Sequence, residues 1–312
     1  MNPLKLLIIP LALAIQSLGA AALPQKAKQT DKPAIVFMVA GQSNAGGCGV
    51  LSPEFHKELG RDKKRPLKPG STAEEIGLPI DAAAYTHSYI WIPGSGFERI
   101  DPADNCRPLE AKARMHGMEL TVVHELEKRF PENDIHVIKL GPSGKSLFHD
   151  WNPERTDGYY ADFVKCQREA MAKLSADYPE VRVIGLYWDQ GEADQRRAGE
   201  YHGNLAELVK RLRTDPGMPG LKFFIRKHLF DLANVGVLVA AQQKVADEDP
   251  NCHLLDIDLG TPEKNYEAWS YTNVKNVHLS SKAFAELTRR LFAGPLRDAS
   301  ITSFDLYKRP ER

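Results

Sequence analysis

The amino-acid sequence predicts an α/β fold with a mainly parallel sheet, and three observations support this prediction. Short runs rich in β-branched and aromatic residues recur along the chain, as in strands that are buried on both faces. Segments whose apolar residues repeat with the period of a helix separate these runs. Small and polar residues follow several of the runs directly, at the place where a parallel sheet gathers its functional groups.

Five strands are expected, at residues 34–40, 135–140, 181–188, 221–226 and 253–257. Apolar stripes indicate three helices between them: Leu120, Val123, Leu126 and Phe130; then Tyr160, Phe163, Ala170, Met171 and Leu174; then Tyr201, Leu205, Leu208 and Leu212. Two more helices are expected, at 235–247 and at 280–292, the last with Ser280 or Ser281 as its N-cap. This regular alternation favours one domain over residues 23–312, although the length would also permit two.

Residues 50–114 interrupt the alternation, because they are rich in proline, glycine and charged residues. The stretch is too long for an ordinary connection, so we expect an insertion that forms the rim of a substrate site. Its basic run at 56–68 is expected to be a solvated loop, with a binding patch as the alternative.

The first 22 residues have the pattern of a signal peptide. Lys5 precedes an apolar run at 6–15, and three small residues at 20–22 form a cleavage site. The apolar run is short for a membrane span, although an uncleaved anchor is the alternative. We therefore expect a secreted or periplasmic protein.

Composition narrows the class of partner. The chain has 41 basic and 41 acidic residues, so no charge bias favours nucleic acid or an anionic membrane. In an oxidising compartment its four cysteines can form disulfides. Three pairings are possible, and pairing Cys48 with Cys106 would tie down the insertion. No Cys-x-x-Cys pair supports a zinc or a thioredoxin-like site.

Three segments that follow strands carry candidate chemical groups. Ser43 lies in the turn GQSNAGG after the first strand, where it is either a nucleophile near helical N–H groups or an ordinary helix cap. Gln190 lies in WDQGEAD after the third strand and can donate to an oxyanion, while its acidic neighbours can equally be a solvated cluster. His278 directly precedes the last helix, within reach of Ser43 across the strand ends.

Two other motifs fail on spacing. Gly144-Lys145-Ser146 resembles the end of a phosphate-binding loop, but the required first glycine is Lys139. His124-Glu125 resembles a zinc-protease helix, but Lys128 occupies the position of the second histidine. The sequence therefore predicts neither a nucleotide nor a metal cofactor.

Five motifs in order resemble the SGNH-hydrolase superfamily. They are GQSN at 41–44, HGMEL at 116–120, GKSLFHDW at 144–151, WDQGEAD at 188–194 and VHLSS at 277–281. More closely, they resemble its sialate O-acetylesterase-like branch, which includes the acetylxylan esterases of carbohydrate esterase family 6. The resemblance covers residues 33–292.

The resemblance implies a flavodoxin-like three-layer α/β/α sandwich with a mainly parallel five-stranded sheet. It further implies metal-free and cofactor-free hydrolysis of acetyl esters on a carbohydrate, through an acyl-enzyme. Ser43 matches the nucleophile and His278 the general base, while Ser43, Gly117 and Gln190 match the oxyanion hole. The residues expected at the substrate are Gln42, Asn44, Gly144, Trp151 and Glu192.

One position departs from the family. Relatives carry an aspartate three residues before the histidine, where it orients the imidazole, and this chain has Lys275. Either another acceptor holds His278, with Asp194 and Asp258 as candidates, or the enzyme is weak. Two alternatives to a carbohydrate O-acetylesterase therefore stay open: an impaired carbohydrate-binding homologue, and an esterase for other acyl esters.

Overall fold

A computed structural model describes residues 30–110, 112–273 and 275–308, so the predicted signal peptide lies outside the described residues. The strands are β1 (Ala34–Gly41), β2 (Gly49–Val50), β3 (Ser88–Ile92), β4 (Gly96–Arg99), β5 (Met115–His116), β6 (Ile135–Leu140), β7 (Val181–Asp189), β8 (Phe223–Arg226), β9 (Cys252–Leu255) and β10 (Asp305–Leu306). The α-helices are α1 (Ser43–Gly46), α2 (Pro53–Glu58), α3 (Met118–Arg129), α4 (Tyr159–Asp177), α5 (Tyr201–Thr214), α6 (Val235–Glu248), α7 (Pro262–Trp269) and α8 (Ser281–Ala293). Short 3₁₀ helices cover Ala82–Ala84, Glu192–Glu200 and Ile301–Ser303.

The main sheet has the strand order β4-β3-β6-β1-β7-β8-β9, and β10 pairs with β7. Strands β3, β6, β1, β7, β8 and β9 run parallel, while β4 and β10 are antiparallel to their neighbours. After β1 the chain forms β3, β4 and β6 on one side of this strand and then β7 on the other. The strand order therefore reverses at the β1/β7 boundary, which is where open α/β sheets bind their ligands.

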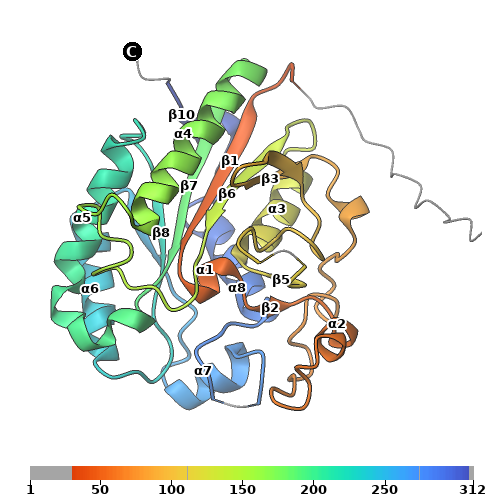
Figure 1. Ribbon diagram of the computed structural model, residues 1–312, viewed down its shortest axis with the longest axis vertical. Coiled ribbons are helices and arrows are strands. Elements are labelled where there is room, and N and C mark those ends of the chain that lie inside the picture. The colour runs from red at the N-terminus through yellow and green to blue at the C-terminus, as the bar shows by residue number, and fades with distance from the viewer. Residues whose placement is uncertain (1–29, 111, 274, 309–312) are drawn as a thin grey trace, which may run out of the picture.

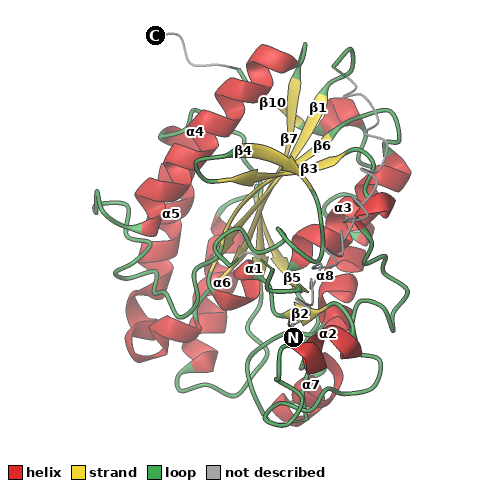
Figure 2. Ribbon diagram, turned by 45° about the vertical axis from the view of Figure 1, so that its right-hand side comes forward, coloured by secondary structure: helices red, strands yellow, loops and turns green. Residues whose placement is uncertain are grey.

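Helices cover both faces of the sheet, as Figures 1 and 2 show. Alternate residues of β1 point to opposite faces: Val36 and Met38 pack with α4, α5 and α6, whereas Phe37 and Val39 pack with α3 and α8. Both sets are fully buried, which explains why β1 reads as a continuous apolar run. The predicted three-layer α/β fold is confirmed.

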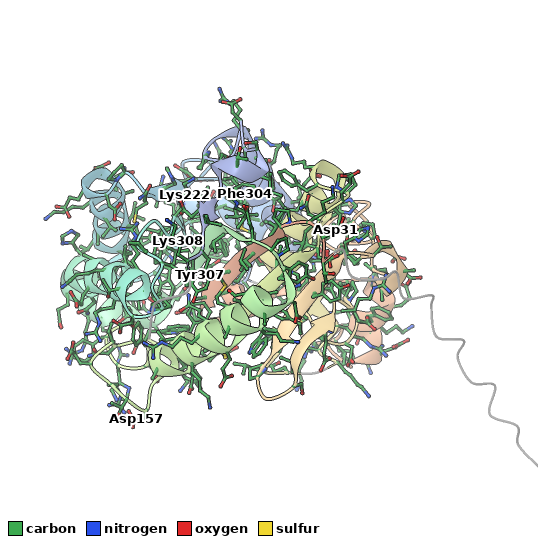
Figure 3. All side chains as sticks on the ribbon, turned by 90° about the horizontal axis from the view of Figure 1, so that it is seen from above. Asp31, Asp157, Lys222, Phe304, Tyr307 and Lys308 are labelled. Carbon is green, nitrogen blue, oxygen red and sulfur yellow. The ribbon has the colours of Figure 1, made fainter. Side chains whose placement is uncertain are left out.

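The sheet is larger than the five strands expected, because segments outside the predicted alternation add to its edges. The predicted insertion supplies β3, parallel to β6, and the antiparallel β4 that completes a hairpin. At the opposite end from α1, the C-terminal segment adds β10, with Tyr307 N–H donating to the Val181 carbonyl at 2.9 Å (Figure 3). Phe304 in the same segment is buried against Phe130 at the end of α3.

The rest of the insertion packs against the segment that leads to His278. Leu67 forms a β-bridge with Thr272, and Lys68 N–H donates to the Tyr271 carbonyl at 3.1 Å. The basic run is thus only partly the solvated loop expected: Lys63 is exposed, but the run begins in α2 and ends on this segment. The insertion forms a wall beside the strand ends.

Candidate active site

Ser43 lies at the sharp turn between β1 and α1. Gly41 makes this turn possible, because its φ is +142° and a Cβ there would collide with the carbonyl oxygen of Asp189. Gln42, not Ser43, occupies the N-cap position of α1, so the interpretation of Ser43 as a helix cap is not supported. Ser43 is instead the first helical residue, and N–H groups of a first turn have no acceptor within their own helix.

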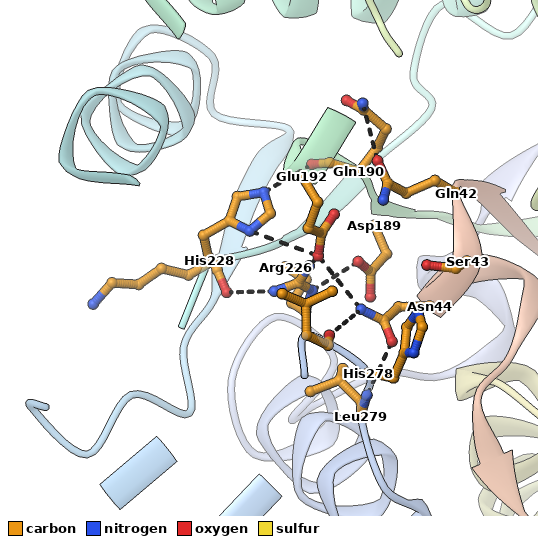
Figure 4. Close-up of polar contacts among 12 residues, drawn as sticks. Gln42, Ser43, Asn44, Asp189, Gln190, Glu192, Arg226, His228, His278 and Leu279 are labelled. Carbon is orange, nitrogen blue, oxygen red and sulfur yellow. Dashed lines mark hydrogen bonds and ion pairs between the residues drawn. The ribbon is translucent and has the colours of Figure 1, made fainter. Parts of the chain in front are cut away.

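Asn44 connects Ser43 to the segment that carries His278. Its Nδ2 donates to the Val277 carbonyl at 2.9 Å, and its Oδ1 accepts from the Leu279 N–H at 3.0 Å. These two residues flank His278, so the side chain next to Ser43 in the chain holds both peptide neighbours of the predicted base (Figure 4). The structure therefore brings together the two segments that carry the predicted nucleophile and base, and the Asn44–Leu279 bond joins residues that are 235 apart in the chain.

The environment of the His278 ring favours its neutral form. Burial lowers its pKa below the usual 6.5, Arg65 and Arg107 lower it further, and only Glu192 opposes them. The ring of Tyr271 lies parallel to it, with centroids 6.4 Å apart. Within the described part of the chain neither ring nitrogen has a hydrogen-bond partner.

None of the three residues discussed for the aspartate position lies at this ring. Lys275 is exposed, and its Nζ lies 5.6 Å from the ring centroid of Tyr266. Asp194 accepts from the N–H groups of Leu147 and Phe148, at 2.7 and 2.9 Å. Asp258 binds Lys227 and Asn265 instead. The two candidate aspartates hold loops in place and do not orient His278.

Gln190 lies where the motif predicts, directly after β7, but its amide already has partners. Nε2 donates to the Lys145 carbonyl at 3.1 Å, to Gln42 Oε1 at 3.3 Å and to the carboxylate of Asp194. Its Oε1 is buried and has no hydrogen-bond partner among the described residues. The side chain is therefore rigidly held beside the turn that carries Ser43.

Gly117, the other predicted oxyanion donor, occupies the N-cap position of α3. Its N–H donates to Glu119 Oε1 at 2.8 Å. Glu119 in turn forms a fully buried ion pair with Lys139, 2.7 Å from Oε2 to Nζ. Gly117 lies close to α1, since a Cβ on it would lie 3.2 Å from the carbonyl oxygens of Asn44 and Ala45.

A buried charge cluster lies behind these groups. Arg226 Nε binds Asp189 Oδ1 at 2.7 Å, and its Nη2 binds Glu192 Oε1 at 2.6 Å. Both carboxylates are buried, so the alternative of a solvated acidic cluster was wrong. Burial raises the pKa of Asp189, whereas Arg226 and His228 outweigh burial at Glu192 and hold its pKa below the usual value.

Sequence reasoning missed Arg226. It is the last residue of β8, and the available signal was a lone charge at the end of an otherwise apolar strand, Phe223–Arg226. Because β7 and β8 run side by side, this position is next to the carboxylates that follow β7. The position of Arg226 at the end of β8 was therefore a sufficient reason to predict that it pairs with Asp189 and Glu192.

The residues predicted at the substrate have different environments. Trp151 is fully buried, with Trp188 and Phe163 at centroid distances of 5.2 and 5.9 Å, so it belongs to the core and the predicted contact was wrong. Gln42, Asn44 and Glu192 are also buried. Gln42 Oε1 and both polar atoms of the Asn44 side chain bind other parts of the protein, and so does Glu192 Oε1, whereas Glu192 Oε2 has no hydrogen-bond partner among the described residues. Gly144 has a φ of +71° and open space around it.

A cavity of about 180 Å³ lies beside α1 and gives room for a ligand near the site. Its wall includes Gly46, Arg107, Leu109, Lys145 and Tyr159. A larger cavity, about 450 Å³, lies between α3 and α8. Neither cavity is lined by a predicted site residue, but the wall of the smaller one includes Gly46 at the end of α1 and Lys145, whose carbonyl accepts from Gln190.

The cysteines do not pair. Cys48, Cys106, Cys166 and Cys252 are all buried as free thiols, so the pairing of Cys48 with Cys106 was wrong. Cys48 Sγ instead donates to the Ser43 carbonyl at 3.2 Å, so it lies next to the turn.

In the part of the chain that the structure covers, no group of three or more histidine, cysteine or acidic residues is arranged to hold a metal ion. Across the same residues, no helix has the length and apolar character of a membrane span.

Several solved structures are similar to this chain. The chain is similar to a solved protein from Arabidopsis thaliana, with 18% identity over 86% of this chain and 99% of that one and a TM-score of 0.60. It is also similar to NanS, with 17% identity, 86% and 98% coverage and a TM-score of 0.57. A carbohydrate acetylesterase from Xanthomonas citri has 15% identity and a TM-score of 0.51, with 82% of this chain and 55% of that chain covered. These likenesses show the fold.

Among curated proteins none matches this chain. A family model described as carbohydrate esterase, sialic acid-specific acetylesterase, matches residues 33–296. That match confirms the resemblance predicted from the motifs, and with it the expected class of enzyme, a hydrolase of acetyl esters. The chain therefore belongs to the carbohydrate esterase family of sialic acid-specific acetylesterases.

Proposed function

We propose that the protein is a secreted carbohydrate O-acetylesterase that works through an acyl-enzyme on Ser43, with His278 as the base. The observation that carries this proposal is the pair of hydrogen bonds from Asn44 to both neighbours of His278. They hold a histidine of lowered pKa beside a serine at a strand-to-helix turn. The pattern of residues 1–22 supports secretion.

The proposed reaction has two steps. Ser43 Oγ attacks the acetyl carbonyl carbon while the ring of His278 takes the hydroxyl proton. The sugar oxygen then leaves, accepts that proton from His278, and the acetyl group remains on Ser43. In the second step His278 takes a proton from water, the hydroxide attacks the acyl carbon, and acetate leaves as the proton returns to Ser43. The negative oxygen formed in each step would be stabilised by the Ser43 N–H, and by the Gly117 N–H and Gln190 Nε2 when it displaces their acceptors in the free protein, Glu119 for Gly117 and Gln42 or Lys145 for Gln190.

The neutral His278 ring suits the first part of this reaction. A base must be unprotonated to accept the serine proton, and burial and two arginines favour that state. The same surroundings make the imidazolium less stable once it forms. This electrostatic balance and the exposed Lys275 favour a second candidate, a carbohydrate-binding homologue with weak esterase activity.

We place the sugar over the cavity beside α1. Tyr159 and Leu109 offer apolar surface there, and Arg107 and Lys145 offer donors for hydroxyl or acidic groups of a glycan. Arg107 comes from the insertion, which fits its expected role as a rim.

Turnover of p-nitrophenyl acetate tests the proposal. We expect hydrolysis by the natural protein and none by Ser43→Ala, with an unchanged melting temperature, because the turn needs only a small residue at that place. A serine-directed phosphonate should label Ser43 alone. Undiminished turnover in the alanine variant would remove the serine-esterase mechanism. Acetate release from acetylated sialic acid against acetylated xylan then identifies the preferred glycan. Hydrolysis of p-nitrophenyl acetate with release from neither glycan favours an esterase for other acyl esters, and no hydrolysis of p-nitrophenyl acetate favours the binding homologue.

A further inference from the structure

The Asn44 amide is held in one orientation by partners of fixed polarity. The Leu279 N–H can only donate, so the atom it meets at 3.0 Å is the oxygen, Oδ1. The Val277 carbonyl can only accept, so the atom it meets at 2.9 Å is the nitrogen, Nδ2. An amide flip would break both bonds, and the two peptide groups are therefore fixed at the same time.

These two bonds restrain the backbone on both sides of His278. A third bond acts on the residue itself, since the His278 N–H donates to Asn276 Oδ1 at 2.8 Å. With the backbone fixed on each side, the side-chain torsions of His278 are left, and the ring of Tyr271 lies beside the imidazole at 25°, with centroids 6.4 Å apart. The backbone that carries the imidazole is thus held without a carboxylate on a ring nitrogen.

Asn44 is itself anchored by charge. Its Nδ2 also donates to Glu192 Oε1 at 3.4 Å, the same oxygen that binds Arg226. Arg226 is fixed in turn by Asp189, and Asp189 accepts from the Tyr187 hydroxyl at 2.6 Å. Asn44, Arg226 and Asp189 are fully buried. A chain of hydrogen bonds therefore runs from the interior between β7 and β8 to the peptide groups that flank His278 (Figure 4).

We propose that Asn44 is the positioning residue that takes over the orienting task of the aspartate absent from position 275, with Glu192 and Arg226 as its anchor. The proposal rests on the proposed function, because it assigns a role in the same Ser43–His278 reaction. It also reassigns Asn44 and Glu192, which the motifs placed at the substrate. Both polar atoms of the Asn44 side chain are bonded inside the protein, so none is left for a sugar. Glu192 binds Asn44 and Arg226 through Oε1, and its Oε2 is buried.

Asn44→Ala tests this role, and Asn265→Ala is the matched control. Asn265 is equally buried and makes the same two kinds of bond: it donates to the Leu229 carbonyl at 2.8 Å and accepts from the Leu259 N–H at 2.9 Å. It serves the turn before α7 and makes no contact with His278. Any general cost of removing a buried asparagine is therefore common to both variants.

We expect kcat of Asn44→Ala to fall by roughly 10² to 10⁴, the range that follows loss of an orienting group, with KM within about twofold. The rate at which a phosphonate labels Ser43 should fall in parallel, because labelling also needs a correctly placed base. Asn265→Ala should lose melting temperature and keep kcat. If the alanine variant unfolds, Asn44→Ser, which retains a polar group in the same space, is measured in its place.

Two results would overturn the proposal. One is a kcat for Asn44→Ala no lower than that of Asn265→Ala at an equal loss of melting temperature. The other is unfolding of both Asn44 variants while Asn265→Ala stays folded, which would make Asn44 a folding determinant only. Ser43→Ala and His278→Ala separate this failure from that of the proposed function: if they are inactive while Asn44→Ala is fully active, only the positioning role is lost.

Discussion

The guanidinium of Arg65 donates to the hydroxyl of Tyr271 at 3.1 Å, and so holds a positive charge beside the aromatic ring that lies parallel to His278. Arg65 belongs to the insertion, whereas Tyr271 belongs to the segment before the last helix. A residue with no proposed role in proton transfer thus sets part of the electrostatic environment of His278, the proposed base.

Arg65→Gln should shift the acid limb of kcat/KM to higher pH. His278 must be neutral to accept the serine proton, so the rate falls as the pH falls through its pKa. Arg65 lowers that pKa, and removing its charge therefore raises it. Lys63→Gln, an exposed change in the same loop, is the control and should leave the profile in place. A limb that stays fixed or moves to lower pH would contradict the electrostatic assignment.

Lys275→Asp should change kcat by less than about tenfold, far below the ~10⁴ that an orienting aspartate contributes elsewhere. The reason is that the side chain at position 275 is exposed and lies over the ring of Tyr266, not at the ring of His278. Lys275→Ala gives the baseline for loss of the lysine alone. A tenfold or greater rise in the aspartate variant would show that His278 lacks an effective orienting group.

Gln190→Ala should lower kcat by roughly 10² to 10³ with little change in KM, as expected for an oxyanion donor. A charged oxyanion accepts more strongly than the neutral oxygens of Gln42 and Lys145, so we expect an Nε2 hydrogen to turn to it in the transition state. Gln167→Ala is the matched control, since Gln167 is an equally buried glutamine in the core beside Met38. A rise in KM at constant kcat would instead assign Gln190 to ground-state binding.

Arg226→Met should lower the free energy of unfolding by about 3–5 kcal/mol, because it leaves two buried carboxylates without their cation. Arg211→Met is the comparison at the surface, where Arg211 also binds two carboxylates, those of Glu154 and Asp215. Its side chain is 31% exposed, and we expect a cost of at most ~1 kcal/mol. Urea unfolding measures the loss of unfolding free energy in both variants. Equal losses would contradict the view that burial makes the Arg226 ion pairs costlier to break than those of Arg211.

The sequence predicted those parts of the fold and site that are encoded locally. The apolar runs predicted the strands on either side of β1, the end of the first strand indicated Ser43, and the start of the last helix indicated His278. Contacts between distant segments could not be predicted in this way, because nothing in the local sequence pattern indicates that Asn44 binds Val277 and Leu279. The hydrogen bonds that decide its role are made only when β1 and the last loop are folded together.

Other errors came from residues whose type permits two environments. Trp151 follows a glycine-rich turn, and a tryptophan there can line a pocket or fill a core; packing on Trp188 decided for the core. β3 and β4 were not predicted because they are short and lie among prolines and glycines. They form because β6 offers an edge to β3, and β3 in turn pairs with β4.

The insertion pairs with the rest of the protein at two places, and this limits how far the segment can be exchanged by engineering or during evolution. One part of it, β3 and β4, closes an edge of the central sheet, while another, around Leu67, is bridged to the segment that leads to the base. Exchanging the whole insertion between relatives to alter glycan preference would therefore remove a strand pair and release the catalytic loop at once. Variation in specificity is expected to accumulate in single rim side chains such as Leu109, which is 49% exposed, rather than through replacement of the segment.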